Sequence, residues 1–137
     1  MTVTVMQESH VPQIAKIEQL CFNDPWSENS IASELNNRLS LWLVAVEDEC
    51  VIGYVGSQTV MGETDMMNIA VAPGFRRQGI AQALVEELVA ALAERKSHSL
   101  MLEVRDSNAP AKALYEKLGF MSLAGAPDTI VTPGKMR

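Results

Sequence analysis

The sequence predicts one α+β domain with α/β-type layers, in which helices cover both faces of a central sheet. Strand-like and helix-like segments follow one another in the order β-α-α-β-β-β-α-β-α. The three consecutive strand segments are largely apolar throughout, so helices should cover the sheet. A long amphipathic segment then separates two strands, which predicts a right-handed crossover between residues 66 and 104. A length of 137 residues fits a single domain.

The first third of the chain is predicted to form one strand and two helices. Thr2–Met6 alternates in polarity and is rich in β-branched residues, which is typical of a strand. Ser9 is a good N-cap for a helix whose apolar residues recur at helical spacing: Val11, Ile14, Ile17 and Cys21. The Asn-Asp-Pro run at 23–25 ends that helix, and Ser27 caps a second helix that carries Ile31 and Leu35.

The middle of the chain is predicted to form an antiparallel meander. Its strands are Leu41–Glu47, Val51–Val60 and Thr64–Val71. Short polar or glycine-containing turns at 48–49 and 62–63 join them.

The last third is predicted to form helix, strand and helix. The helix from Gly79 to about Arg95 has apolar residues on one face, namely Ile80, Leu84, Leu88 and Leu92. Leu100–Val104 is the next strand, and a helix follows from about Ala109 to Leu118, where Gly119 provides a left-handed stop.

Composition narrows the class of protein. Hydrophobic residues make up 47% of the chain, so a real core can form, and no apolar run approaches the roughly 18 residues of a membrane span. The N-terminal residues do not resemble a secretion signal, so we expect a cytoplasmic protein without a membrane partner. The formal net charge of −6 argues against a protein held to nucleic acid by phosphate contacts.

The cysteines and histidines predict no metal site. Cys21 and Cys50 are the only cysteines, and neither lies in a CxxC motif or near a histidine. We expect both to be buried, reduced thiols. His10 and His98 are isolated, so no spacing typical of metal ligands occurs.

A strand-to-helix junction at residues 68–84 has the features of an anion site. A helix N-terminus carries unpaired N–H groups and partial positive charge. Gly79 would let the backbone approach an anion, Ala81 is almost as small, and Arg76 and Arg77 add full charge. Neither a Walker loop nor a dinucleotide fingerprint is present. The alternative is a surface loop with solvated arginines.

Four motifs together resemble a known family. They are Arg76-x-x-Gly79-x-Ala81, Leu102-Glu103-Val104-Arg105-x-x-Asn108, Ala113-Leu114-Tyr115-x-x-Leu118-Gly119-Phe120 and Phe22-x-x-Pro25-Trp26-Ser27. The first resembles the acetyl-CoA signature of the GNAT N-acetyltransferases. The combination resembles the bacterial ribosomal-protein-alanine N-acetyltransferases, the RimI type, over about residues 1–120. The resemblance implies the GNAT fold, with a mixed, mostly antiparallel sheet.

The resemblance also implies an acetyl-CoA site. The strand residues that would bond the pantetheine arm through their backbone are Ile69, Ala70 and Val71. The residues that would hold the pyrophosphate are Arg76, Arg77, Gln78, Gly79, Ile80, Ala81 and Gln82. Asn108 resembles the residue that hydrogen-bonds the cosubstrate.

Acetyl transfer from a thioester needs a base for the amine and an acid for the thiolate. Glu103 is the only acidic residue of its strand, between two apolar neighbours that point to the other face, so we expect a partly desolvated carboxylate suited to a base. The alternative is a salt bridge to Arg105 or Lys112. The resemblance implies that Tyr115 donates a proton to the thiolate. The residues alone predict equally well a core tyrosine with one hydrogen bond.

The implied function is acetylation of a protein N-terminus, in particular an N-terminal alanine of a small-subunit ribosomal protein. An α-amine titrates near ~8 and a lysine near ~10.4, so the α-amine is easier to deprotonate. A GNAT enzyme acting on lysine or a small amine stays open. So does a CoA-binding domain with little activity.

After Phe120 the family pattern stops, and residues 121–137 have no clear strand pair. We therefore expect an incomplete last strand pair, and a monomer or a dimer completed by strand exchange. The codons of residues 124–137 can also be read with a shift of one base, which leaves the first base of each shifted codon free to vary. Permitted choices of that base give Gly-Arg-Arg-Pro-Arg-Tyr-Tyr-Ser-Asn-Pro-Arg-Glu-Asp-Ala. This resembles the family's usual continuation, with an Arg-rich turn, a Tyr-Tyr pair, Asn-Pro and Glu-Asp-Ala. We hypothesise a single-base deletion near codons 123–124. Because the restored segment would be arginine-rich, the net charge carries no argument about a basic partner.

Overall fold

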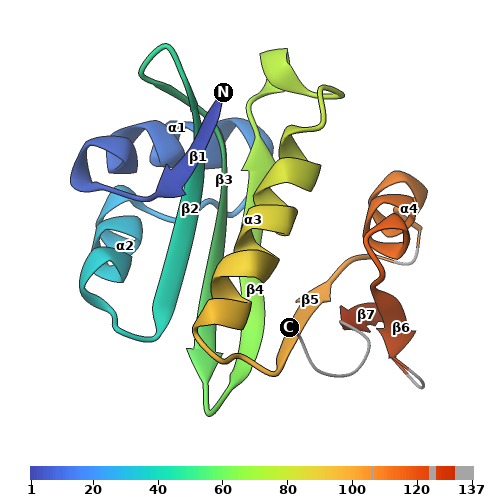
Figure 1. Cartoon of the computed structure of the whole chain (residues 1–137). Coiled ribbons are helices and arrows are strands. Elements are labelled where there is room, and N and C mark those ends of the chain that lie inside the picture. The colour runs from blue at the N-terminus through green and yellow to red at the C-terminus, as the bar shows by residue number, and fades with distance from the viewer. Residues whose placement is uncertain (106, 124–125, 132–137) are drawn as a thin grey trace.

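The computed structural model describes residues 1–105, 107–123 and 126–131 (Figure 1). Its strands are β1 (Thr2–Val5), β2 (Ser40–Glu47), β3 (Cys50–Val60), β4 (Glu63–Val71), β5 (Ser99–Glu103), β6 (Met121–Leu123) and β7 (Ala126–Val131). Its α-helices are α1 (Val11–Cys21), α2 (Glu28–Ser33), α3 (Ile80–Glu94) and α4 (Ala109–Lys117). Short 3₁₀ helices are η1 (Glu8–His10), η2 (Glu34–Asn36) and η3 (Pro73–Phe75).

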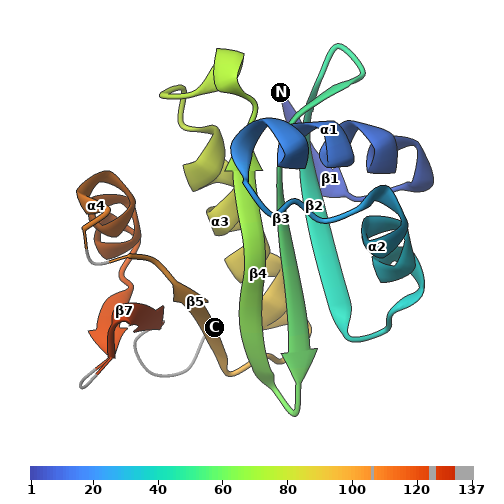
Figure 2. The ribbon, with the colours of Figure 1, turned by 180° about the vertical axis from the view of Figure 1, so that it is seen from behind.

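The strands form one mixed sheet in the order β1-β2-β3-β4-β5-β7-β6. Every neighbouring pair is antiparallel except β4 and β5, which are parallel and joined through α3. Helices α1 and α2 lie on one face of the sheet and α3 on the other, as the two opposite views show (Figures 1 and 2). The predicted fold class, with helices on both faces, is therefore confirmed.

Each face of the sheet has its own core. On the α3 side, Leu84, Leu88 and Leu92 are fully buried against residues of the central strands and β5. On the α1 side, apolar residues of α1 and α2 pack on Trp42 and Tyr54, whose rings stack at 5.9 Å. Burial on both faces explains why β2 and the first half of β3 are largely apolar.

A β-bulge in β4 shapes the molecule. Gly56 of β3 pairs with Asn68, but the next residue, Ser57, pairs with Met66, so Met67 is an extra residue. A bulge bends its strand and increases its twist. Pairing between β4 and β5 covers only Glu63–Asp65 with Ser99–Met101. From Met66 onward the two strands separate, and the ribbon shows β5 leading away from β4 toward α4 (Figure 2).

The segment after Phe120 departs from our expectation. A strand pair does form there, and β7 pairs antiparallel with β5 from Met101↔Val131 to Glu103↔Thr129. The pair is short, because β6 spans 3 residues. Residues 124–125 and 132–137, which belong to the predicted frame-shifted segment, lie outside the described residues.

Smaller corrections concern a cap and the two cysteines. Ser9 lies within the 3₁₀ turn η1, so it does not cap α1, which begins at Val11. Ser27 does cap α2, since its hydroxyl accepts from the Ser30 N–H at 3.1 Å. Cys21 is half-buried and Cys50 is exposed, because Cys50 stands at the β2–β3 turn. The expectation that both are buried is therefore wrong.

Within the described ranges, no helix is long and apolar enough to cross a membrane. The same part of the chain holds no group of three or more His, Cys, Asp or Glu side chains that could hold a metal ion.

Gly56 should tolerate no side chain, because a Cβ added there would overlap the ring of Trp42. We expect Gly56→Ala to lower the free energy of unfolding by about 1–3 kcal/mol, the usual cost of overpacking. Urea denaturation measures it. Gly74→Ala is the matched control, since an added Cβ at Gly74 meets no atom within 4 Å. Equal stability of the two variants would contradict the packing argument.

Candidate active site

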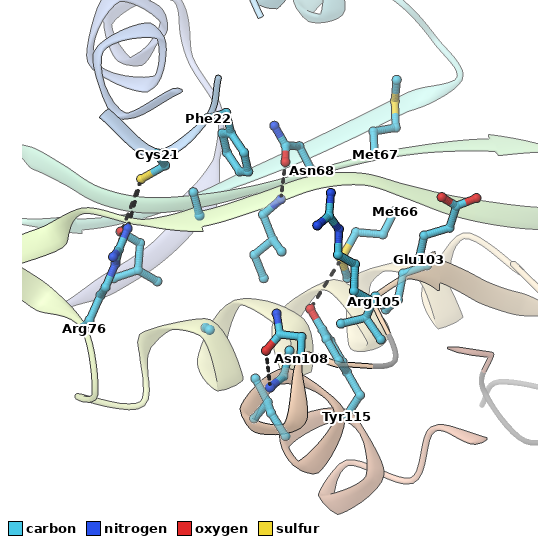
Figure 3. Close-up of a pocket in the computed structure, with 18 residues that line it drawn as sticks. Cys21, Phe22, Met66, Met67, Asn68, Arg76, Glu103, Arg105, Asn108 and Tyr115 are labelled. Atoms are coloured by element: carbon cyan, nitrogen blue, oxygen red, sulfur yellow. Dashed lines mark hydrogen bonds between the residues drawn. The ribbon is translucent and has the colours of Figure 1, made fainter. Parts of the chain in front are cut away.

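The separation of β4 from β5 opens a cavity of about 550 Å³. Its walls are the end of α1, the free edge of β4, the end of β5 and helix α4 (Figure 3). Figure 3 labels ten of the residues that line the cavity: Cys21, Phe22, Met66, Met67, Asn68, Arg76, Glu103, Arg105, Asn108 and Tyr115. Segments about 50 to 100 residues apart in the sequence therefore meet at one site.

The free edge of β4 presents backbone groups to this cavity. Ala72 donates its N–H to the Ile52 carbonyl at 2.9 Å, so by the alternation of an antiparallel pair Ile69 and Val71 direct theirs away from β3. The Ile69 N–H is held by the side-chain oxygen of Asn68 at 3.2 Å. Ile69, Ala70 and Val71 all line the cavity, as the site prediction requires. An amide-containing ligand could pair with this edge as a strand would.

The loop before α3 has the geometry expected of an anion site. Gly79 is the N-cap of α3 and has a left-handed φ of +78°, and Arg77 also has a positive φ. The first intrahelical bond runs from Ala83 to the Gly79 carbonyl, so the N–H groups of the first turn remain available to a ligand. A Cβ at Gly79 would meet no protein atom within 4 Å, which leaves room for an approaching group.

The other residues predicted for this loop differ in position. Arg76 and Ala81 line the cavity, whereas Arg77, Gln78 and Gln82 do not. The side chain of Ile80 is buried in the core, so only its backbone could contact a ligand. Gln82 accepts a 3.4 Å bond from Lys117, which links α3 to α4.

Arg76 is engaged with the wall of the cavity. Its Nε donates to the Val71 carbonyl at 3.3 Å and its Nη2 to the Cys21 sulfur at 3.3 Å. These contacts fold the guanidinium back toward β4. A ligand anion at the start of α3 would offer this cation a stronger partner than a thiol.

Asn108 stands where β5 leads into α4. Its side-chain oxygen accepts from the Ala111 N–H at 3.2 Å, which makes it the N-cap of α4. Because capping uses the oxygen, the Nδ2 group remains as a donor at the cavity wall.

Glu103 lies at the end of β5, and its carboxylate is exposed. Its neighbours Leu102 and Val104 are buried on the opposite face, as alternation predicts. The expected desolvation is wrong, because separation of β4 from β5 leaves the carboxylate open to water. No ion pair joins Glu103 to Arg105, both of which the structure describes.

Tyr115 lies on α4 and is buried, with 5% of its surface exposed. Its ring packs edge-on against Phe120 with centroids 5.6 Å apart, and its hydroxyl donates to the Met66 sulfur at 4.0 Å. Burial raises the pKa of Tyr115 to about 12. The hydroxyl therefore keeps its proton near neutral pH and can donate it into the cavity.

A second opening of about 540 Å³ adjoins the first. It is lined by Asp65, Met66, Met67, Met101, Leu102, Glu103 and Thr129. Met66, Met67, Leu102 and Glu103 line both openings. Two reactants can therefore approach separately and meet beside Glu103.

Sequence reasoning missed several residues of the site. Met66 and Met67 were assigned only to a strand, because the bulge that turns them into the cavity depends on pairing with β3. Glu18 was not singled out, although its spacing of four from Ile14 places it on the apolar face of α1. A lone carboxylate within an apolar helical stripe is the signal that could have found it.

Residues 11–120 match the model of the "Acetyltransferase (GNAT) family". The chain belongs to the GNAT acetyltransferase family. It is 39% identical over 119 residues to the [ribosomal protein bS18]-alanine N-acetyltransferase of Escherichia coli K12, covering 87% of this chain and 80% of that one.

Solved GNAT structures agree with the fold. The crystal structure of the ribosomal-protein-S18-alanine N-acetyltransferase from Escherichia coli superposes with a TM-score of 0.85 at 32% identity, covering 99% of this chain and 95% of that one. Arabidopsis thaliana NAA60 in complex with acetyl-CoA has a TM-score of 0.82 at 17% identity, with 95% of each chain covered, and shares the fold.

The cosubstrate of this GNAT domain is acetyl-CoA, and the residues present fit it. The free edge of β4 offers backbone groups to an amide-containing arm. The start of α3 offers unpaired N–H groups and open space at Gly79 to a pyrophosphate.

Gly79→Val should weaken acetyl-CoA binding, because a branched side chain would occupy the space before α3 and strain a left-handed residue. We expect the Kd, measured by isothermal titration calorimetry, to rise by at least about tenfold, or ~1.4 kcal/mol. Gly119→Val is the matched control, since Gly119 also has a positive φ and open surroundings but follows the end of α4 and not the start of α3. An equal rise in Kd in both variants would show that backbone strain, and not the filled space before α3, weakens binding.

Proposed function

We propose that this protein transfers the acetyl group of acetyl-CoA to the α-amine of a protein N-terminus in the cytoplasm. Its acceptor is an N-terminal alanine of a small-subunit ribosomal protein. The observation that carries the proposal is the 39% identity, over 87% of the chain, to an enzyme named for that reaction. The two adjoining openings agree with it, since one can take the cosubstrate and the other the acceptor.

The proposed chemistry divides the proton transfers between two residues. Glu103, directly or through a water molecule, takes the proton that the ammonium must lose before its nitrogen attacks the thioester carbonyl. Tyr115 gives its hydroxyl proton to the sulfur as the C–S bond breaks and the C–N bond forms. The nitrogen then loses its second proton to become the neutral amide, and this proton restores the Tyr115 hydroxyl. Ile69–Val71, the loop from Arg76 to Gln82, and Asn108 hold the cosubstrate in this proposal.

The acceptor can be weighed by its own chemistry. An α-amine has a pKa near ~8, against ~10.4 for a lysine. At neutral pH an exposed carboxylate therefore removes a proton more easily from the α-amine than from a lysine. A lysine or a small amine is the competing acceptor. A CoA-binding domain with little turnover is the competing kind of protein.

We further propose that residues 1–120 are the GNAT domain and that 121–137 are an atypical segment in a shifted reading frame. The Gly- and Pro-containing composition of 124–134 supports this. Sequencing the gene tests it, since codons that forbid the alternative reading would end the hypothesis. Whether the chain is a monomer or a dimer completed by strand exchange stays a prediction for size-exclusion chromatography with light scattering.

Release of CoA thiol with an alanine-initiated peptide tests the function. We expect turnover with a free N-terminal Ala, and none when that amine is blocked and only a lysine side chain remains. Turnover with the blocked peptide would favour the lysine acceptor. Binding of acetyl-CoA without turnover on any amine would favour the binding module.

Glu103→Gln should lower kcat by about 10²–10⁴ while leaving the Kd for acetyl-CoA unchanged, because it removes only the proton acceptor. Steady-state kinetics and calorimetry measure the two effects. Glu63→Gln is the matched control, an exposed strand carboxylate outside the cavity. An unchanged kcat in Glu103→Gln would remove Glu103 from the mechanism.

Tyr115→Phe should reduce kcat to a comparable degree, since it keeps the ring against Phe120 and loses only the hydroxyl proton. Unfolding by urea should show that the variant remains folded. An unaltered rate together with an unaltered pH–rate profile would reduce Tyr115 to a packing residue.

A further inference from the structure

A buried carboxylate outside the proposed chemistry lies directly behind the acetyl-CoA cavity. Glu18, on α1, is 0% exposed. Burying a carboxylate costs free energy unless donors compensate it. Here the side chain receives three donors from three parts of the chain: the Trp26 N–H, the Tyr54 hydroxyl and the Asn68 amide.

One oxygen of Glu18 closes the loop after α1. Its Oε1 accepts from the Trp26 N–H at 2.8 Å, while its backbone carbonyl accepts from the Phe22 N–H at 2.9 Å. The loop from Phe22 to Trp26 is thus tied to Glu18 at both ends. Phe22 lines the cavity, so this loop is one of its walls.

The other oxygen of Glu18 holds a second wall, the free edge of β4. Its Oε2 accepts from Asn68 Nδ2 and from the Tyr54 hydroxyl. Asn68 adjoins the bulged Met67, and its Oδ1 contacts the Ile69 N–H on the free edge of β4 (Figure 3). Burial, with the Glu18 carboxylate beside it, raises the pKa of Tyr54, so that hydroxyl remains a donor.

One buried side chain therefore spans two walls of the cavity. We propose that Glu18 is a positioning residue for acetyl-CoA, acting through Asn68 to fix the bulge and the free edge of β4 against the loop after α1. An apolar residue could fill the same space, but it could not fix the direction of the Asn68 amide. The inference rests on the use of acetyl-CoA and not on the identity of the acceptor.

The chain offers a matched control for burial. Glu34 is 8% exposed and accepts from Trp42 Nε1 at 3.2 Å, Ser40 Oγ at 3.1 Å and Gln58 Nε2 at 3.1 Å. None of these four residues lines the acetyl-CoA cavity. Glu34→Gln thus disturbs a comparable buried network elsewhere in the fold.

The test is calorimetric titration of acetyl-CoA into folded variants. Loss of a charged hydrogen bond next to the ligand should raise the Kd of Glu18→Gln by about tenfold, a change of ~1.4 kcal/mol. Glu34→Gln should lower the unfolding midpoint but leave the Kd within about twofold of the original chain. An unchanged Kd in Glu18→Gln, or an equal rise in both variants, would overturn the proposal.

A double-mutant cycle separates positioning from independent effects. If Glu18 acts through Asn68, the Kd of Glu18→Gln/Asn68→Ala should equal that of Asn68→Ala alone. Additive losses would overturn the proposed link. Should Glu18→Gln fail to fold, Asn68→Ala decides, and an unchanged Kd would refute the inference. Because no acceptor is present, these outcomes stay distinct from failure of the peptide assay.

Discussion

The extra residue in β4 is the constraint on which the rest of the structure depends. With Met67 inserted opposite β3, β4 can pair with β5 over only a few residues before the strands separate. That separation creates both openings and frees the backbone edge from Met66 onward. It also brings the end of β5 and helix α4 to the cavity. A regular sheet of the same strands would have no such site.

A free strand edge is normally a liability, because its unpaired groups invite pairing with other chains. Here the chain covers its own edge. The Asn68 side chain holds the Ile69 N–H, and Arg76 and Cys21 lie on the Val71 carbonyl. These contacts are long, at 3.2, 3.3 and 3.9 Å, so a ligand amide or phosphate would offer the same groups better partners. The edge is therefore satisfied in the free protein and still available for binding.

Local patterns predicted the elements well, because their signals lie within the elements themselves. The apolar stripe of α3 and the alternation around Glu103 both appear in the structure. The bulge could not be predicted, since it depends on register between β3 and β4 and has no Gly or Pro at Met67 to mark it. For the same reason the exposure of Glu103 was missed. The strand pair after Phe120 was not predicted, because Gly and Pro in this segment are typical of turns. The pair is short, and β7 is paired with β5, which is distant in the sequence.

The two proposed proton carriers lie in opposite surroundings, and their tasks require this. A base that must pass its proton on to solvent benefits from contact with water, and Glu103 is exposed where the two openings join. An acid must keep its proton until the leaving thiolate takes it. Tyr115 is buried, and its raised pKa preserves the neutral hydroxyl. Both environments follow from the separation of β5 from β4. That separation exposes Glu103 at the end of β5. It also leads the chain into α4, where Tyr115 packs on Phe120 and its phenol is buried.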